Sequence, residues 1–346
     1  MSVNPYTLSF GKEPTKVLPR FSQMQEVLDN FEAEPPSQQV YMITGMRGSG
    51  KTVLMTEIVH HIRKNEQWVT VELNPARDLL TGLAAKLYNH SSIKRLFSDA
   101  KIDLSFFGIG LEIKKAEPVT DIEVAISRML EILKKKGKKV LISIDEATNT
   151  DEMKVFASSF QIFLREDYPI YLLMTGLYEN IDALQNNKIL TFLHRAPKLS
   201  LAPLDIASVA IHYEEAFSLD MESAKEMAVL TKGYPFAFQV LGYYTFQKNG
   251  DYNGVIPEYR QYLFDNVYNK IWSELSPKEK KILYAIASSS EGKTGEVLEI
   301  AKMKKNELSP YRDKLIKKGY INGDDRGYLC FSIPLFDSYV KYSYIE

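Results

Sequence analysis

Short runs of consecutive apolar residues alternate, in the first half of the chain, with longer stretches in which apolar residues recur at helical spacing. The runs at 40–44, 68–73, 140–144 and 170–174 have the length and composition of buried β-strands. Between them, apolar residues recur every three or four positions, most regularly over 121–136, as on one face of an α-helix. Strands that alternate with helices predict an α/β fold, in which helices cover both faces of a parallel sheet.

The same spacing predicts further helices at 20–32, directly after Gly50, at 77–96 and at 151–166. The segment 102–113 contains two adjacent phenylalanines and two glycines. We expect this segment to form a small hairpin inserted before the next helix.

The second half of the chain has a different pattern. Residues 206–272 predict helices only, with breaks at 233–235 and 249–253. After them, three helices are expected at 277–288, 295–303 and 309–318, and a turn at 322–327 separates two strand-like runs. Three helices followed by a hairpin are typical of a winged helix-turn-helix domain. We therefore expect three domains: an α/β core with an N-terminal linker at 1–200, a helical lid at 201–272 and a winged helix at 273–346.

The composition is that of a globular protein and excludes several kinds of site. Of 346 residues, 45% are hydrophobic and 25% are charged, which is ordinary for a globular protein. Lys and Arg number 43 against 44 Asp and Glu, so any surface for nucleic acid must be a local patch. Cys330 is the single cysteine, which excludes an intrachain disulfide and a cysteine zinc site. There is neither a signal-like start nor an apolar run of membrane-spanning length, so we expect a cytoplasmic protein without a membrane partner.

One motif predicts a phosphate-binding loop. Residues 45–52 fit the pattern G-x-x-x-x-G-K-[ST], between a predicted strand and a predicted helix. In such a loop, phosphates are bound by backbone N–H groups and by the N-terminus of the helix that follows. Lys51 would reach the β- and γ-phosphates, and Thr52 would hold Mg²⁺. The alternative is a glycine-rich turn without a ligand. The motif predicts ATP and Mg²⁺ as cofactors, with these nucleotide-binding residues: Gly45, Met46, Arg47, Gly48, Ser49, Gly50, Lys51, Thr52 and Val53.

Two carboxylates follow the third predicted strand. Asp145 suits the Mg²⁺ shell, and Glu146 suits the polarisation of an attacking water, since hydrolysis needs a base near the γ-phosphate. Thr175 ends the fourth predicted strand. If that strand lies between the strand of the phosphate loop and the acidic strand, Thr175 would contact the γ-phosphate or the water. The alternatives are a surface acidic pair and a threonine that caps a turn.

These residues together resemble the AAA+ and STAND group of P-loop ATPases over about 40–272, and the winged helix fits the origin-recognition-like branch. The resemblance implies an ATPase, slow or stimulated by a partner. It implies that Pro235, in a G-x-P segment of the lid, packs on the nucleotide, although Pro235 also suits the first position of a helix. It further implies that Arg195 is an arginine finger for a neighbouring subunit, in a homo-oligomer that forms with ATP. The usual lid arginine is not evident after Gly233, where Lys232 is the nearest substitute.

The third predicted helix of the C-terminal domain is basic. Residues 302–318 carry seven basic and two acidic side chains, and Ser309 and Pro310 suit the start of a helix. Such a helix can lie in the major groove of duplex DNA with its cations on phosphates. The candidate DNA-binding residues, all expected on the outer surface or its edges, are Arg312, Lys314, Lys317, Lys318 and, in the wing, Arg326.

Two functions remain open from the sequence. In the first, ATP binding drives assembly of the subunits and duplex DNA binding by the winged helix, and ATP hydrolysis releases the DNA. In the second, the chain is a nucleotide-dependent switch that binds a protein partner and no DNA. Acidic residues in the wing and the aromatic C-terminus suit the second.

Overall fold

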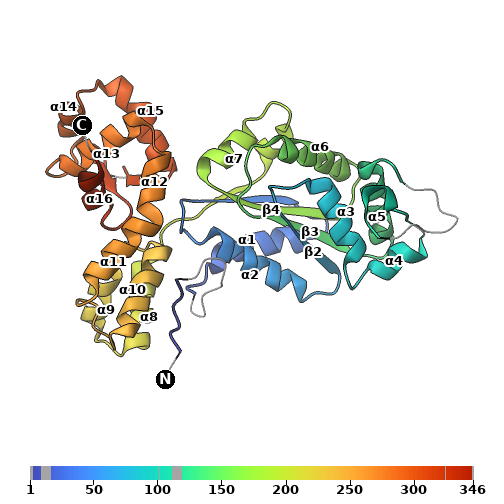
Figure 1. The fold of residues 1–346 in the computed structure, drawn as a ribbon, viewed down its shortest axis with the longest axis horizontal. Coiled ribbons are helices and arrows are strands. Elements are labelled where there is room, and N and C mark those ends of the chain that lie inside the picture. Colours follow the sequence, from blue (N-terminus) through green and yellow to red (C-terminus); the bar gives the residue numbers. More distant parts are fainter. Residues whose placement is uncertain (1–2, 9–16, 101, 111–118, 324, 345–346) are drawn as a thin grey trace. The chain divides into compact units, whose positions relative to one another are not determined.

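The computed structural model describes residues 3–8, 17–100, 102–110, 119–323 and 325–344 (Figure 1). The chain divides into two compact units. The sheet unit comprises Arg20–Thr44 and Lys51–Ser200. The helical unit comprises Met1–Pro19, Leu201–Glu346 and also the loop Gly45–Gly50. No helix among the described residues has the length and apolarity needed to cross a bilayer.

The sheet unit is built on one parallel sheet in the order β2-β3-β4-β1-β5. This confirms the predicted α/β fold, and β4 lies between β1 and β3. The fifth strand is absent from the sequence prediction because three residues are too few to show an apolar pattern. The strands are β1 Val40–Thr44, β2 Trp68–Leu73, β3 Lys139–Ile144, β4 Ile170–Gly176 and β5 Lys198–Ser200.

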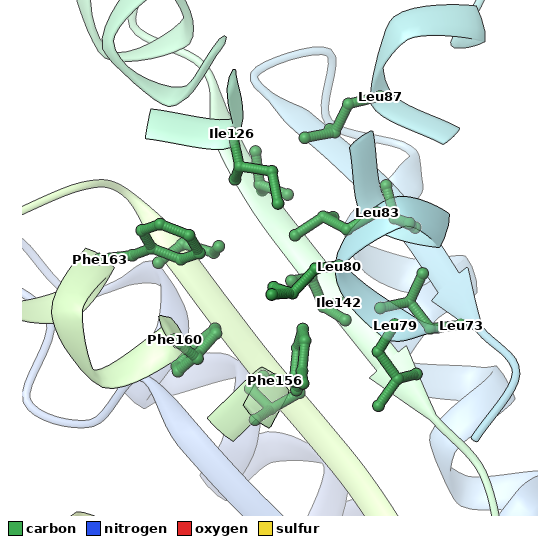
Figure 2. Packing of buried hydrophobic residues seen from close by; sticks show 14 of the residues in the cluster. Leu73, Leu79, Leu80, Leu83, Leu87, Ile126, Ile142, Phe156, Phe160 and Phe163 are labelled. Carbon is green, nitrogen blue, oxygen red and sulfur yellow. The ribbon is translucent and has the colours of Figure 1, made fainter. Parts of the chain in front are cut away.

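Helices cover both faces of this sheet. On one face, leucines of α3, Ile126 of α5 and phenylalanines of α6 surround Ile142 of β3 in one buried cluster (Figure 2). On the opposite face, Phe31 of α1 packs its ring against those of Tyr41 and Tyr171, with centroids 5.7 and 5.2 Å away. The helices are α1 Phe21–Glu32, α2 Lys51–Arg63, α3 Leu79–Asn89, α4 Lys94–Asp99, α5 Ile122–Lys135, α6 Asp151–Arg165 and α7 Tyr178–Gln185.

The hairpin expected at 102–113 is not found in its described part. Residues 102–110 contain a 3₁₀ turn, Ser105–Phe107, and no strand. The Asp103 carboxylate accepts the N–H of Ser105, and Gly108 closes the turn with φ of 70°. Leu104 and Ile109 are buried in the core, so their apolar character reflects packing rather than a sheet. Residues 111–113 lie outside the described part.

The helical unit contains helices and one two-stranded antiparallel hairpin, β6 Ile321–Asn322 with β7 Cys330–Phe331. The helices predicted near 277–288, 295–303 and 309–318 correspond to α13, α14 and α15. The two strand-like runs form the hairpin, but Asn322, expected in the turn, belongs to β6, and residue 324 lies outside the described part. The helices are α8 Ile206–Phe217, α9 Met221–Val229, α10 Pro235–Gln247, α11 Ile256–Leu263, α12 Asn269–Glu274, α13 Pro277–Ser288, α14 Thr294–Ala301, α15 Lys305–Lys317 and α16 Phe336–Ser343.

The predicted start of α15 is wrong. The helix begins at Lys305, not at Pro310, because the Glu307 carboxylate accepts the N–H of Lys304 at 2.8 Å and closes the first turn earlier. Pro310 lies inside the helix, where it removes one backbone hydrogen bond. Ser309 is therefore an interior residue and not a cap.

Candidate functional site

The loop Gly45–Gly50 joins β1 to α2, and α2 begins at Lys51. Gly48 and Gly50 have φ of 72° and 88°, a region that side chains other than glycine disfavour. At Gly48 a side chain would also collide with the Tyr234 hydroxyl. Lys51, Thr52 and Val53 follow in the first turn of α2, and Val53 is half-buried. The strand–loop–helix setting that the motif needs is present.

The segment before α10 contacts this loop within the helical unit. The Tyr234 hydroxyl donates a 2.6 Å hydrogen bond to the Arg47 carbonyl oxygen. The N–H of Phe236 donates to the Gly48 carbonyl oxygen at 3.1 Å. Pro235, between them, is the first residue of α10, where its missing N–H costs nothing. Both contacts from this segment use carbonyl groups of the loop and none of its N–H groups.

Arg47 and Met46 turn their side chains to other parts of the helical unit. Arg47 forms an ion pair with Glu274 of α12, with Nη2 2.7 Å from Oε1 and Nε 3.4 Å from Oε2. Lys270 lies 3.3 Å from the same carboxylate. Burial raises the pKa of Glu274, but hydrogen bonds and charge from Arg47 and Lys270 outweigh it and hold the pKa below its usual value. Gly319, with φ of 81°, lies against Met46, whose Cε is 2.9 Å from where a Cβ would be.

The carboxyl ends of β3 and β4 bring the acidic residues together with Thr52 in the sheet unit. The Thr52 hydroxyl donates to Oδ2 of Asp145 at 2.9 Å. The Thr175 hydroxyl donates to Oδ1 of Asp145. The N–H of Glu146 donates to Thr175 Oγ1 and to Asp145 Oδ1, both at 3.1 Å. One carboxylate is thus held by two hydroxyl groups, beside the residue expected to act as base.

Thr175 is fully buried, and its single hydroxyl proton is engaged by Asp145. Glu146 is exposed, and its carboxylate accepts no hydrogen bond from the described residues. Its φ of 54° is a left-handed conformation that costs a non-glycine residue roughly 1 kcal/mol or more. The Thr175 hydroxyl oxygen accepts a hydrogen bond from the Glu146 N–H. This contact stabilises the strained backbone and holds the Cα of Glu146 in place.

The structure places the remaining predicted residues apart from this network. Arg195 ends a 3₁₀ turn, Thr191–Arg195, is exposed, and makes no ion pair with the part of the chain that is described. Lys232 donates from Nζ to the Phe331 carbonyl oxygen at 3.0 Å, so its amine is engaged inside the helical unit. Within the described ranges, no group of three or more His, Cys, Asp or Glu side chains could hold a metal by itself.

The expected surface position of Lys318 is wrong. Lys318 is 5% exposed and forms a 2.9 Å ion pair with Glu279 of α13, which is itself buried. Lys314 lies 3.2 Å from the same carboxylate, and Arg312 donates to the Gly323 carbonyl oxygen at 3.2 Å. Lys317 and Arg326 are exposed. The sequence missed Glu279 because nothing in the spacing shows that its carboxylate is turned inwards and needs a cation.

Glu274 and Tyr234 are the other residues of interest that sequence reasoning did not single out for a role. Tyr234 lies inside the G-x-P segment, so the motif already indicated its place. Glu274 carries no local signal, because its partner Arg47 is 227 positions away in the chain.

Residues 20–190 match the family described as the ATPase domain predominantly from Archaea, and residues 265–340 match a domain of unknown function, DUF8462. No curated protein matches the sequence.

Solved structures resemble almost the whole chain. The Aeropyrum pernix ORC2 protein, in its ADPNP–ADP complexes, superposes with a TM-score of 0.60 at 13% identity, over 96% of this chain and 95% of that chain. Cdc6p from Pyrobaculum aerophilum gives a TM-score of 0.50 at 14% identity, over 96% of both chains. Identities this low show the fold alone. The chain therefore has the full-length Cdc6/ORC-like fold: a parallel sheet with helices, a helical region and a C-terminal part with a small hairpin.

Proposed function

We propose that the protein binds ATP with Mg²⁺ and hydrolyses it to ADP and phosphate, because residues 20–190 match the model of an ATPase domain family found predominantly in Archaea. The nucleotide state would then control assembly of the chain and the binding of duplex DNA by its C-terminal domain. Turnover is expected to be slow or stimulated by a partner.

The observation that carries this proposal is the hydrogen bond between Thr52 and Asp145. The hydroxyl of Thr52, which ends the phosphate-loop motif, donates to the carboxylate of Asp145, directly after β3, with 2.9 Å between the two oxygens. A hydroxyl oxygen and a carboxylate are hard oxygen donors, the kind that Mg²⁺ prefers beside substrate phosphates. Bound Mg²⁺ would neutralise charge on the β- and γ-phosphates. The donor set of this chain therefore fits the ion.

The other residues have separate roles in the proposal. Glycine N–H groups of the loop and the N-terminus of α2 bind phosphate oxygens, and Lys51 adds its charge. Glu146, whose exposed carboxylate accepts no hydrogen bond from the described residues, accepts a proton from the attacking water. Thr175 is a positioning residue that holds Asp145 and the Glu146 backbone. Pro235 places its neighbours against the loop, and Arg195 acts on the nucleotide of a neighbouring copy.

Duplex DNA is the proposed partner of the C-terminal domain. The helical order and hairpin of 273–346 support a winged helix, and exposed lysines of α15 supply cations for phosphates. Because Lys318 is buried and Arg312 donates to the Gly323 carbonyl oxygen, the proposed contacts are those of Lys314, Lys317 and Arg326. We expect binding that weakens steeply with salt and depends on ATP.

A protein partner in place of DNA is the second candidate. The observation that favours it is the loss of two cations from the expected DNA surface, since Lys318 is buried and Arg312 is bound to the Gly323 carbonyl. Binding of a duplex by the Glu146→Gln protein, with ATP and with ADP over a salt titration, separates the two. ATP-dependent, salt-sensitive binding supports DNA, and no binding in either state supports the protein partner.

The nucleotide proposal is tested by titration calorimetry of ATP with Mg²⁺ into the wild type and Lys51→Ala. The wild type should bind one ATP, and Lys51→Ala should lose binding because the charge opposite the β- and γ-phosphates is gone. Lys64→Ala, in the turn after α2, is the matched control and should bind as the wild type does. Equal binding by Lys51→Ala would overturn the assignment of the loop.

A further inference from the structure

The loop Gly45–Gly50 contacts the rest of the helical unit at three successive positions. Met46 packs on the buried cluster of that unit, beside Gly319. Arg47 reaches Glu274 on α12. At Gly48 the absence of a side chain leaves room for Tyr234, which donates to the Arg47 carbonyl. A loop that only binds phosphates needs none of these contacts.

The ion pair is the specific part of this attachment. Arg47 presents two nitrogen atoms to the two carboxylate oxygens of Glu274, the fork geometry that makes an Arg–carboxylate pair directional. Both side chains are about one-third exposed, so water and salt reach the pair. Glu274 is the last residue of α12, two residues before Ser276 caps α13. The pair therefore joins the loop to the point where the lid and the C-terminal domain meet.

We propose that Glu274 is a positioning residue for the phosphate loop, which acts through Arg47 to slow the release of bound nucleotide. The inference rests on the proposed function, because it concerns the same loop. Phosphates are held by backbone N–H groups, and these bind well only while the loop keeps one shape. A contact that restricts the loop before the ligand arrives improves affinity mainly through a slower dissociation rate.

The same contact connects the nucleotide state of the loop to the C-terminal domain. Any change of loop shape on exchange of ATP for ADP moves the backbone of Arg47, and with it the partner of Glu274. Glu274 lies at the start of the C-terminal domain expected at 273–346. Glu274 thus gives the C-terminal domain a direct connection to the loop, without the lid arginine that is not evident in this chain.

The test is the dissociation rate of a fluorescent ADP, mant-ADP, from the full chain by stopped-flow displacement with excess ADP. Glu274→Gln should release mant-ADP about two- to fivefold faster, the effect of one partly exposed ion pair. The exchange Arg47→Glu with Glu274→Arg restores the pair in reverse and should recover most of the wild-type rate. Glu258→Gln, an exposed glutamate of α11 without an ion pair among the described residues, is the matched control.

The salt dependence of the mant-ADP release rate distinguishes an electrostatic role of Glu274 from a purely structural one. Between low and high salt, release from the wild type should accelerate towards the rate of Glu274→Gln, while that of Glu274→Gln should change little. The melting temperatures of both proteins show whether the fold is intact.

The outcomes are distinct. A Glu274→Gln rate equal to the wild-type rate, or no recovery in the exchanged pair, overturns the inference and leaves the proposed function standing. A wild type that does not bind mant-ADP at all overturns the proposed function, and the inference with it.

Discussion

The hydroxyl of Thr52 donates a 2.9 Å hydrogen bond to Oδ2 of Asp145, and so connects the start of α2 to the end of β3. Both oxygens are proposed to face one Mg²⁺. Thr52→Ala should therefore lower ATP affinity in the presence of Mg²⁺ by about tenfold, and have little effect in excess chelator. Equilibrium binding of ATP under both conditions measures the difference. A Thr52→Ala protein whose affinity still rises with Mg²⁺ as in the wild type would contradict the assignment.

Thr175 is expected to affect turnover more than binding. Thr175→Val has nearly the same shape, but it removes the donor to Asp145 and the acceptor of the Glu146 N–H. The Glu146 N–H then keeps its hydrogen bond to Asp145 Oδ1 but loses the one to Thr175, and Asp145 loses a hydroxyl donor, so the backbone of the residue proposed as base is held less firmly. We expect kcat to fall at least tenfold with KM within threefold. Thr175→Ser keeps the hydroxyl and should retain most of the activity. Steady-state kinetics of the two variants checks this, and equal loss in both would assign Thr175 to packing alone.

The buried pair of Glu279 and Lys318 predicts a pH-dependent stability. Burial raises the pKa of Glu279, but hydrogen bonds from Ser276 and Lys318 and the Lys318 charge outweigh it and lower the pKa to about 2. A carboxyl group with a lowered pKa in the folded state stabilises the fold above its unfolded pKa. That contribution is lost as the pH falls towards the folded pKa.

Glu279→Gln should therefore lower the free energy of unfolding by about 3 kcal/mol at pH 7. The difference from the wild type should shrink between about pH 4.5 and about pH 2. Urea unfolding over that pH range measures it. Glu299→Gln, at an exposed glutamate of α14, is the control and should change little. A difference that is the same at all pH values would show that Glu279 does not act through its charge.

The proposed DNA surface predicts a change in salt dependence. Lys317→Glu with Arg326→Glu should weaken ATP-dependent duplex binding and reduce the slope against log salt by about two. Lys225→Glu with Lys248→Glu makes the same change of net charge on exposed residues of the lid and is the control. Fluorescence anisotropy with a labelled duplex measures both. Equal weakening in the two variants would show that net charge matters and not this surface.

Periodicity was enough for the elements that bury a continuous apolar face, such as β3 and α5. It failed where the chain is held by single polar contacts. The start of α15 depends on the Glu307 carboxylate and the Lys304 N–H, and the burial of Lys318 depends on Glu279, 39 residues earlier. The candidate site shows the same division. The loop and the acidic pair follow from sequence spacing, whereas the attachment of Arg47 to Glu274 depends on a fold that brings distant residues together.

The identity of the nucleotide bound to Glu146→Gln tests the central claim most directly. The variant keeps the loop, Thr52 and Asp145, and loses only the proposed base. After incubation with ATP and Mg²⁺ and removal of free nucleotide, chromatography of the extracted ligand should find ATP on Glu146→Gln and ADP on the wild type. ADP on both proteins would contradict the assignment of Glu146, and no nucleotide on either would contradict the account of the loop.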